Sequence, residues 1–111
     1  MRIYISGPIS NDPDYYKKFE KVAYELVEMG HKVINPAELI NVMPEDATHK
    51  EYMNICIRLL EMADTIIMLP EWERSKGACI EYGYSLASNK NIVEWEYMER
   101  KNNEQINNSE T

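Results

Sequence analysis

The sequence predicts a single α/β domain, built as a three-layer sandwich with a four- to five-stranded parallel sheet and helices on both faces. Three observations support this prediction. Short β-branched and aromatic segments alternate with longer segments of helical periodicity. Residues 65–69 are continuously apolar, which is typical of a parallel strand that is covered on both faces. The chain has 111 residues, of which 44% are hydrophobic, and this fits one compact core.

The first strand is predicted at residues 2–6, because isoleucine and tyrosine dominate this segment. Gly7 and the proline after it end the strand and begin a loop. Asp12 and Pro13 form a good N-cap and first-turn pair, so we expect a helix to begin there. Apolar residues then recur at helical spacing until Gly30, which ends the helix.

A second short strand is predicted at residues 32–35, where Pro36 ends it. The following segment, up to residue 46, contains two prolines and several apolar residues, and it could fold over a pocket. Thr48 and Glu51 have the spacing of a capping box, which predicts the start of a second helix. Asp64 ends this helix and leads into the apolar strand at 65–69.

Residues 70–87 join that strand to a third helix. Ser75 is the predicted N-cap, so free N–H groups and the positive end of the helix dipole should face a ligand. Glu81 lies one turn further on, with Gly77 four residues before it and Ser85 four residues after it. These small neighbours leave a hollow beside the carboxylate. The alternative is an ordinary amphipathic helix with a solvated glutamate.

The chain closes with a predicted strand at 92–93 and a polar segment rich in Asn, Glu and Lys. We therefore assign residues 1–95 to the domain and residues 96–111 to a flexible tail. The carboxyl ends of parallel strands lie at one edge of a sheet, so the loops after the first three strands should form one site there. This architecture is of the Rossmann or flavodoxin type.

Composition excludes several classes of partner. A net charge of −7 and a pI near 4.8 argue against nucleic-acid binding, which needs a basic surface. No apolar run is long enough to span a membrane or to serve as a signal sequence, so we expect a cytoplasmic protein. Cys56 and Cys79 are expected to be buried and reduced, and His31 and His49 show no metal-type spacing with them. We expect no metal site.

Cofactor motifs are also missing from the loops. The first loop lacks the G-x-G-x-x-G pattern of dinucleotide sites, and the third lacks the G-x-x-x-x-G-K pattern of nucleoside-triphosphate sites. We therefore expect no cofactor and a smaller ligand.

Three stretches carry a resemblance to a known family: Ile3-Tyr-Ile-Ser-Gly-Pro-Ile9, Ala63-Asp64 before the apolar strand, and Ser75-x-Gly77-x-x-x-Glu81. They resemble the nucleoside 2-deoxyribosyltransferase superfamily over most of residues 2–93. The form Leu69-Pro-x-Trp-x-x-Ser-Lys-Gly-Ala-x-x-Glu81 is similar to a small phage and bacterial group within it, a domain of unknown function (DUF4406-like).

The resemblance implies an enzyme that transfers a deoxyribose between bases or hydrolyses the N-glycosidic bond of a nucleoside 5′-monophosphate. It implies that Glu81 is the nucleophile and that Tyr4 contacts this glutamate or the sugar. It also implies a set of residues around the 5′-hydroxyl or 5′-phosphate. This set comprises Gly7, Pro8, Ile9, Ser10, Ser75 and Gly77. Trp72 is a further candidate, which could stack on the base or lie in a dimer contact. Homodimers are usual in the superfamily, so we expect a homodimer or a higher homo-oligomer.

Cys56 departs from the family pattern. It occupies the position on the second helix where the characterised relatives carry an aspartate, which serves the leaving base. A neutral thiol is a poor substitute for a carboxyl group. Three functions are therefore considered: a glycosidic enzyme, a nucleotide-binding or sequestering module without turnover, and an interaction protein that uses its acidic surface.

Overall fold

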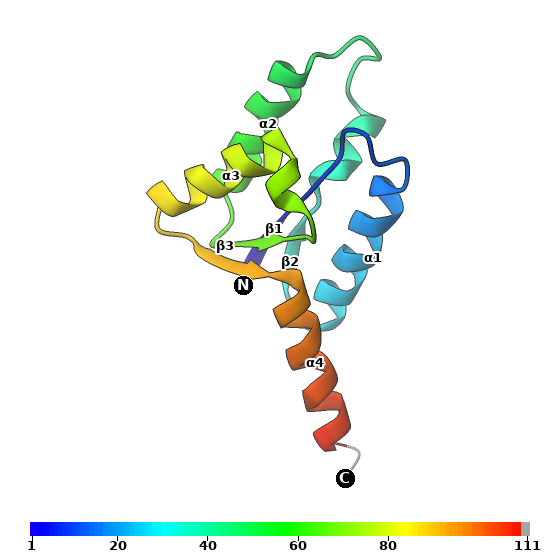
Figure 1. Ribbon diagram of the computed structural model, residues 1–111, viewed down its shortest axis with the longest axis vertical. Coiled ribbons are helices and arrows are strands. Elements are labelled where there is room, and N and C mark those ends of the chain that lie inside the picture. The colour runs from blue at the N-terminus through cyan, green and yellow to red at the C-terminus, as the bar shows by residue number, and fades with distance from the viewer. Residues whose placement is uncertain (110–111) are drawn as a thin grey trace.

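The computed structural model describes the backbone of residues 1–109 and the side chains of residues 1–104 (Figure 1). Its elements are β1 (Arg2–Ser6), α1 (Tyr15–Glu28), β2 (Lys32–Ile34), the 3₁₀ helix η1 (Pro36–Asn41), α2 (His49–Glu61), β3 (Thr65–Met68), the 3₁₀ helix η2 (Trp72–Arg74), α3 (Lys76–Ala87), β4 (Asn91–Glu94) and α4 (Trp95–Ser109).

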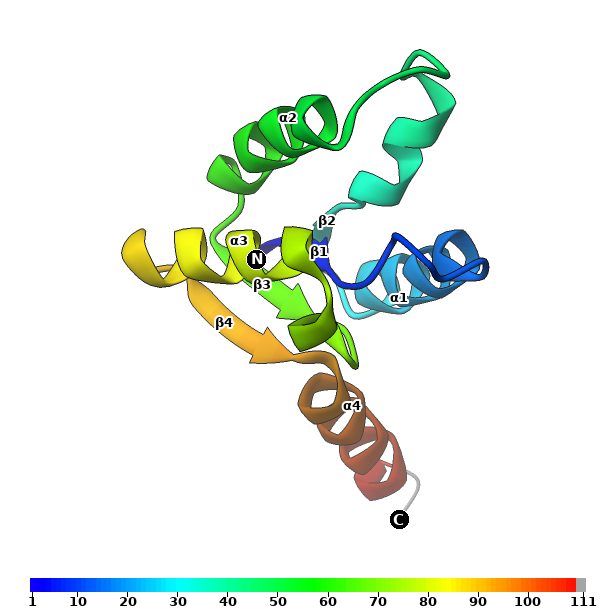
Figure 2. The ribbon, with the colours of Figure 1, turned by 45° about the horizontal axis from the view of Figure 1, so that its top comes forward.

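The four strands form one parallel sheet in the order β2-β1-β3-β4. Tyr4 of β1 pairs with Ile34 on one side and with Ile66 on the other, so β1 lies in the middle of the sheet. The order reverses direction between β1 and β3, and this is where open α/β sheets bind ligands. The prediction of a parallel α/β sandwich is confirmed, with four strands (Figure 2).

Each face of the sheet has its own core, because side chains alternate along a strand. Ile3 and Ile5 of β1 pack with Phe19 and Leu26 of α1 on one face. Tyr4 of β1 belongs to the core on the other face, where α2 and α3 pack. The sheet therefore lies between α1 and the pair formed by α2 and α3.

The predicted helix signals at Thr48 and Ser75 are confirmed. Thr48 and Glu51 form a complete capping box at α2, and the Ser75 hydroxyl accepts a hydrogen bond from the N–H of Ala78 at α3. Gly30 has a φ of +93° after α1. The following N–H, that of His31, bonds to the carbonyl of Leu26, which closes the helix end.

The predicted N-cap of α1 at Asp12 is wrong by two residues, because the N-cap is Asp14 and α1 begins at Tyr15. Asp12 instead forms a turn before the helix. Its carboxylate accepts a hydrogen bond from the N–H of Asp14 at 2.9 Å and pairs with Lys18 at 2.9 Å. An aspartate that bonds to the backbone two residues on favours a turn over a helix.

Residues 96–111 were predicted to be a flexible tail, whereas in the structure residues 95–109 form the helix α4. Trp95 is 6% exposed and lies in the core on the α1 face, and Met98 packs against the same core. These side chains lie three residues apart on a segment without Gly or Pro, so they hold the first turn of the helix. Residues 110–111 lie outside the described part. α4 extends away from the sheet (Figure 1), and the molecule measures 53 × 30 × 24 Å.

The 3₁₀ helix η1 forms part of the segment between β2 and α2. Asn35 caps η1 by accepting a hydrogen bond from the N–H of Ala37 at 3.1 Å, and Pro36 and Ala37 are buried.

Among the described helices, none combines the length and apolar character that crossing a bilayer requires.

Candidate functional site

Glu81 is a buried carboxylate on the side of α3 that faces the sheet, and it is 6% exposed. The Tyr4 hydroxyl donates a hydrogen bond to its Oε2 atom. The Ser6 hydroxyl donates to its Oε1 atom at 2.6 Å. β1 thus supplies a separate donor to each oxygen of the glutamate. The expected contact between Tyr4 and Glu81 is present.

Burial governs the charge of this carboxyl group. Loss of solvation raises the pKa of Glu81 to about 7, against the lowering effect of the hydrogen bonds from Ser6 and Tyr4. Near neutral pH the group is divided between its charged and neutral forms, which is a useful property in an acid–base or nucleophilic group.

Cys56 reaches the same cluster from α2. It is 6% exposed and packs with Tyr4 in the core on this face. Burial raises the pKa of the Cys56 thiol to about 11, and the charge on Glu81 adds to this, while a hydrogen bond with Tyr4 lowers it. Burial also raises the pKa of Tyr4 well above its usual value. Both groups are therefore neutral at physiological pH, and Glu81 is the member of this cluster that titrates.

The expected hollow beside Glu81 is closed at Gly77 by side chains of α2. A Cβ atom on Gly77 would lie 3.1 Å from Sδ of Met53 and 3.6 Å from Nε2 of His49. Small residues on this face of α3 therefore allow close packing against α2. Ser85, at the other end of this face, is completely buried.

The two helices that frame Glu81 begin at the same edge of the sheet. α2 begins at His49 and α3 at Lys76, and His49 lies beside Gly77. The first N–H groups of any α-helix have no acceptor within the helix, so those of Lys76 and Gly77 are available to an anion. The Ser75 hydroxyl is occupied as the cap of Ala78.

The loops after β1 and β3 contact each other where they leave the sheet. A Cβ atom on Gly7 would lie only 2.8 Å from Cβ of Leu69, and the N–H of Leu69 bonds to the carbonyl of Ser6 at 2.8 Å. Gly7 is therefore required for the close approach of these chains. Beyond it, Pro8 is half-buried, and Ile9 and Ser10 are exposed at the edge.

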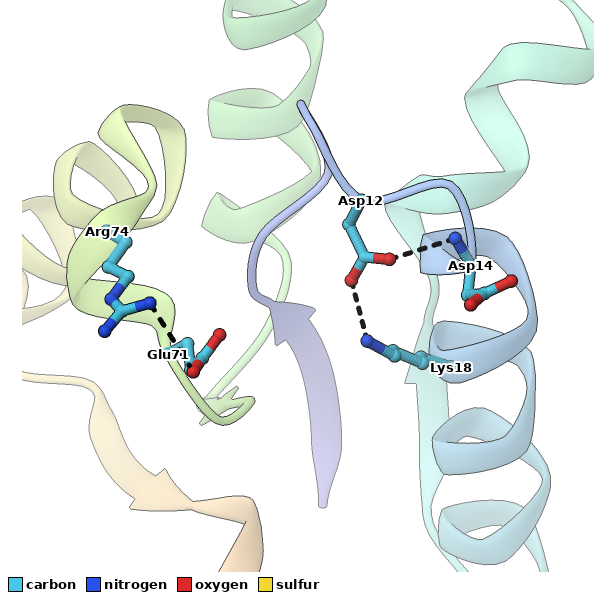
Figure 3. Close-up of polar contacts among 5 residues, drawn as sticks. All are labelled: Asp12, Asp14, Lys18, Glu71 and Arg74. Carbon is cyan, nitrogen blue, oxygen red and sulfur yellow. Dashed lines mark hydrogen bonds and ion pairs between the residues drawn. The ribbon is translucent and has the colours of Figure 1, made fainter.

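The charged side chains along these loops pair with one another (Figure 3). Lys18 pairs with Asp12 at 2.9 Å, and Arg74 pairs with Glu71 at 3.7 Å. Both side chains of the Arg74–Glu71 pair are exposed, and in the other pair Lys18 is exposed while Asp12 is partly buried, so each pair contributes little to stability. Arg74, a basic residue next to the α3 turn, thus already has an acidic partner.

Trp72 lies on the other side of the third loop. Its ring stacks on Tyr82 with a centroid separation of 4.6 Å. It also lines a cavity of about 220 Å³ at the ends of β3 and β4. The lining of this cavity includes four glutamates and does not include Tyr4, Ser6 or Glu81. They are Glu71, Glu73, Glu94 and Glu96. Because none of the residues of the Glu81 cluster lines this cavity, the two are separate. The negative charge of the lining disfavours a phosphate in the cavity.

Sequence reasoning missed Ser6, Met53 and His49. Ser6 could have been found, because it lies two residues after Tyr4 on the same strand and therefore faces the same side. Met53 and His49 depend on how α2 packs, which no local pattern shows. Cys79 was expected to be buried, but it is exposed on the outer side of α3, and both cysteines are free. Within the described residues, no group of three or more His, Cys, Asp or Glu side chains is arranged to hold a metal ion.

Comparisons with known proteins agree with this architecture. A solved structure of a 2-deoxyribosyltransferase from the psychrotolerant bacterium Bacillus psychrosaccharolyticus superimposes with a TM-score of 0.64 at 21% sequence identity, over 85% of this chain and 71% of the other. This likeness shows the fold, a nucleoside 2-deoxyribosyltransferase-like α/β sandwich. A comparison with curated proteins found no match. The model of a domain of unknown function, DUF4406, matches residues 1–94, so the chain belongs to the DUF4406 family.

Proposed function

We propose that this protein cleaves or transfers the N-glycosidic bond of a nucleoside or nucleoside 5′-monophosphate, with Glu81 as the nucleophile. The observation that carries the proposal is the buried Glu81 carboxyl group with a hydroxyl donor on each oxygen. Its location at the reversal point of the sheet, and a fold shared with a 2-deoxyribosyltransferase, give further support.

In this mechanism an oxygen of Glu81 attacks the anomeric carbon of the sugar. The bond from that carbon to the base breaks, and the base leaves with the bonding electrons. The transition state resembles an oxocarbenium ion, which a nearby carboxylate stabilises before a covalent ester forms. Water or a second base then attacks the same carbon and releases Glu81. Water gives hydrolysis, and a base gives transfer.

The leaving base needs a proton or a hydrogen bond as it departs. Cys56 is the group near Glu81 that lies where the family resemblance places an aspartate. With a pKa of about 11, its thiol holds its proton at neutral pH and is a weak acid. Catalysis would therefore be slow for bases that are poor leaving groups.

A 5′-phosphate is placed by this proposal at the beginning of α3. The N–H groups of Lys76 and Gly77 and the positive ends of the α2 and α3 dipoles all favour an anion there. Backbone groups would bind the phosphate, because Arg74 and Lys18 have acidic partners. Gly7, Pro8, Ile9 and Ser10 would border the sugar from the adjacent loop.

The second candidate is a nucleotide-binding module without turnover. The neutral Cys56 thiol favours it, because the group expected to assist the leaving base is a poor acid here. This module would keep the ligand contacts and release no base. A homodimer or higher homo-oligomer is also proposed, from the family resemblance alone, and light scattering would read at least twice the 13.1 kDa chain mass.

The test is a base-release assay with the common ribo- and deoxyribonucleosides and their 5′-monophosphates, with and without a second free base as acceptor. The substitution Glu81→Gln should abolish release, while Glu20→Gln, an exposed glutamate on α1, should not change it. Release that survives Glu81→Gln would remove the mechanism. Thermal stabilisation by a nucleotide without any release would favour the binding module.

A further inference from the structure

Ser6 holds one side of the Glu81 carboxyl group. Its hydroxyl donates to Oε1 at 2.6 Å, whereas Tyr4 donates to Oε2. Ser6 is 1% exposed and Glu81 is 6% exposed, so the hydrogen bond is shielded from water. Hydrogen bonds to a charged group are strong when they are buried, and removal of one partner leaves the other without solvation.

The donors constrain the charge of Glu81. A carboxylate accepts hydrogen bonds only, and each hydroxyl has a single proton to donate. If Glu81 takes up a proton, one of its oxygens becomes a donor, and the hydroxyl beside that oxygen has to turn its own proton away. Ser6 and Tyr4 together therefore favour the ionised carboxyl group, although burial disfavours it.

We propose that Ser6 is a positioning residue for Glu81: the Ser6 hydroxyl favours the ionised form of the carboxyl group and fixes it with one oxygen toward the sugar. This inference rests on the proposed function, in which Glu81 attacks the anomeric carbon. Ser6 need not contact the substrate. The strand provides the precision, because β1 lies between two hydrogen-bonded neighbours in the middle of the sheet.

Few other groups near Glu81 titrate. Tyr4 on β1 and Cys56 on α2 have raised pKa values and stay neutral near pH 7. The neighbouring β3 presents the apolar Ile66 and Met68 to this face. His49 lies further out, beside Gly77. Because Tyr4 and Cys56 stay neutral, a titration that is read at the Glu81 carboxyl carbon reports on Ser6 without a change of charge at these two groups.

A purely structural role for Ser6 is the competing explanation, and Ser85 provides a matched control. Ser85 is a buried serine one turn after Glu81 on α3. Its hydroxyl has no hydrogen-bond partner among the described residues. Ser85→Ala therefore removes a buried serine hydroxyl without removing a donor to Glu81.

The experiment compares the wild-type chain with Ser6→Ala, Ser6→Thr and Ser85→Ala. Carbon-13 NMR of the Glu81 carboxyl carbon follows its titration, and base release is measured from pH 5 to 9. In Ser6→Ala we expect the titration midpoint to rise by about one pH unit. Base release should fall about tenfold below the midpoint and recover above it, since only the ionised form attacks.

Ser6→Thr, which retains the hydroxyl, should restore the wild-type midpoint, and Ser85→Ala should leave it unchanged. An unchanged midpoint in Ser6→Ala would overturn the proposal, as would an equal loss of base release at every pH. Circular dichroism establishes that each variant is folded. A midpoint that shifts in a chain without any base release would refute the proposed function while supporting the link from Ser6 to Glu81.

Discussion

Tyr4 and Glu81 are 77 residues apart in the chain and share a buried hydrogen bond in the space between β1 and α3. The strand pairing of β1 and the packing of α3 together create this contact. The cluster at Glu81 therefore depends on the complete fold, and it should be lost when the sheet is disrupted.

The first prediction concerns stability against pH. Folding raises the pKa of Glu81 from 4.5 to about 7, so the folded state favours the protonated group. The stability that this raised pKa contributes to the folded state is fully present below pH 4.5 and is lost as the pH rises through 7. We expect Glu81→Gln to gain about 3 kcal/mol of unfolding free energy relative to the wild type between pH 4.5 and pH 8. Urea unfolding at several pH values measures this gain, and the exposed Glu20→Gln variant should show none.

The second prediction uses two glycines. Gly7→Ala should destabilise the fold by about 2 kcal/mol, because the new Cβ atom would lie 2.8 Å from Cβ of Leu69. Gly83→Ala should stabilise it by about 1 kcal/mol, because its Cβ meets no atom within 4 Å and alanine favours a helix. Chemical denaturation measures both. Equal effects of the two substitutions would contradict the close approach at Gly7.

The third prediction concerns Cys56. Cys56→Asp would place a carboxyl group at the position that the family resemblance assigns to an acid. If base release is limited by the leaving base, the rate should rise at least tenfold, since a general acid typically contributes about 100-fold or more. The same change at Cys79, which is exposed, serves as the control. A folded Cys56→Asp protein with no gain in rate would favour the binding module.

The fourth prediction tests how α4 is held. Trp95 is 6% exposed in the core, whereas Tyr97 is 52% exposed. Trp95→Ala should lower the unfolding free energy by about 3 to 5 kcal/mol. Tyr97→Ala should change it by less than about 0.5 kcal/mol. Limited proteolysis should cut α4 faster in the Trp95→Ala variant alone.

Much of the fold could be predicted because its signals are local. The apolar run of β3 and the caps at Thr48 and Ser75 are properties of a few neighbouring residues. α4 was missed because the composition of this segment is polar and Trp95, which is buried, has its packing partners on distant elements. The N-cap of α1 was placed wrongly at Asp12 for a different reason, since one aspartate can cap a helix or close a turn.

The candidate site could be predicted only in part. The family resemblance selected Glu81 and Tyr4, and the structure brings them together. The raised pKa of Glu81 could not be predicted from the sequence, because it depends on desolvation by residues from several elements. Met53 and His49 reach Gly77 through helix packing, which leaves no mark on the local sequence.

The close approach of Gly7 to Leu69 divides the loops after β1 and β3 into closely packed bases and exposed tips. The bases of the two loops are joined by the hydrogen bond from the N–H of Leu69 to the carbonyl of Ser6, and Gly7 approaches Leu69 so closely that there is no room for a Cβ atom. Their tips, near Ile9 and Glu71, lie exposed. Under the proposed function, substitutions at the tips would alter ligand preference without loosening the frame that holds Glu81, so that specificity could change while this carboxyl group stays in place.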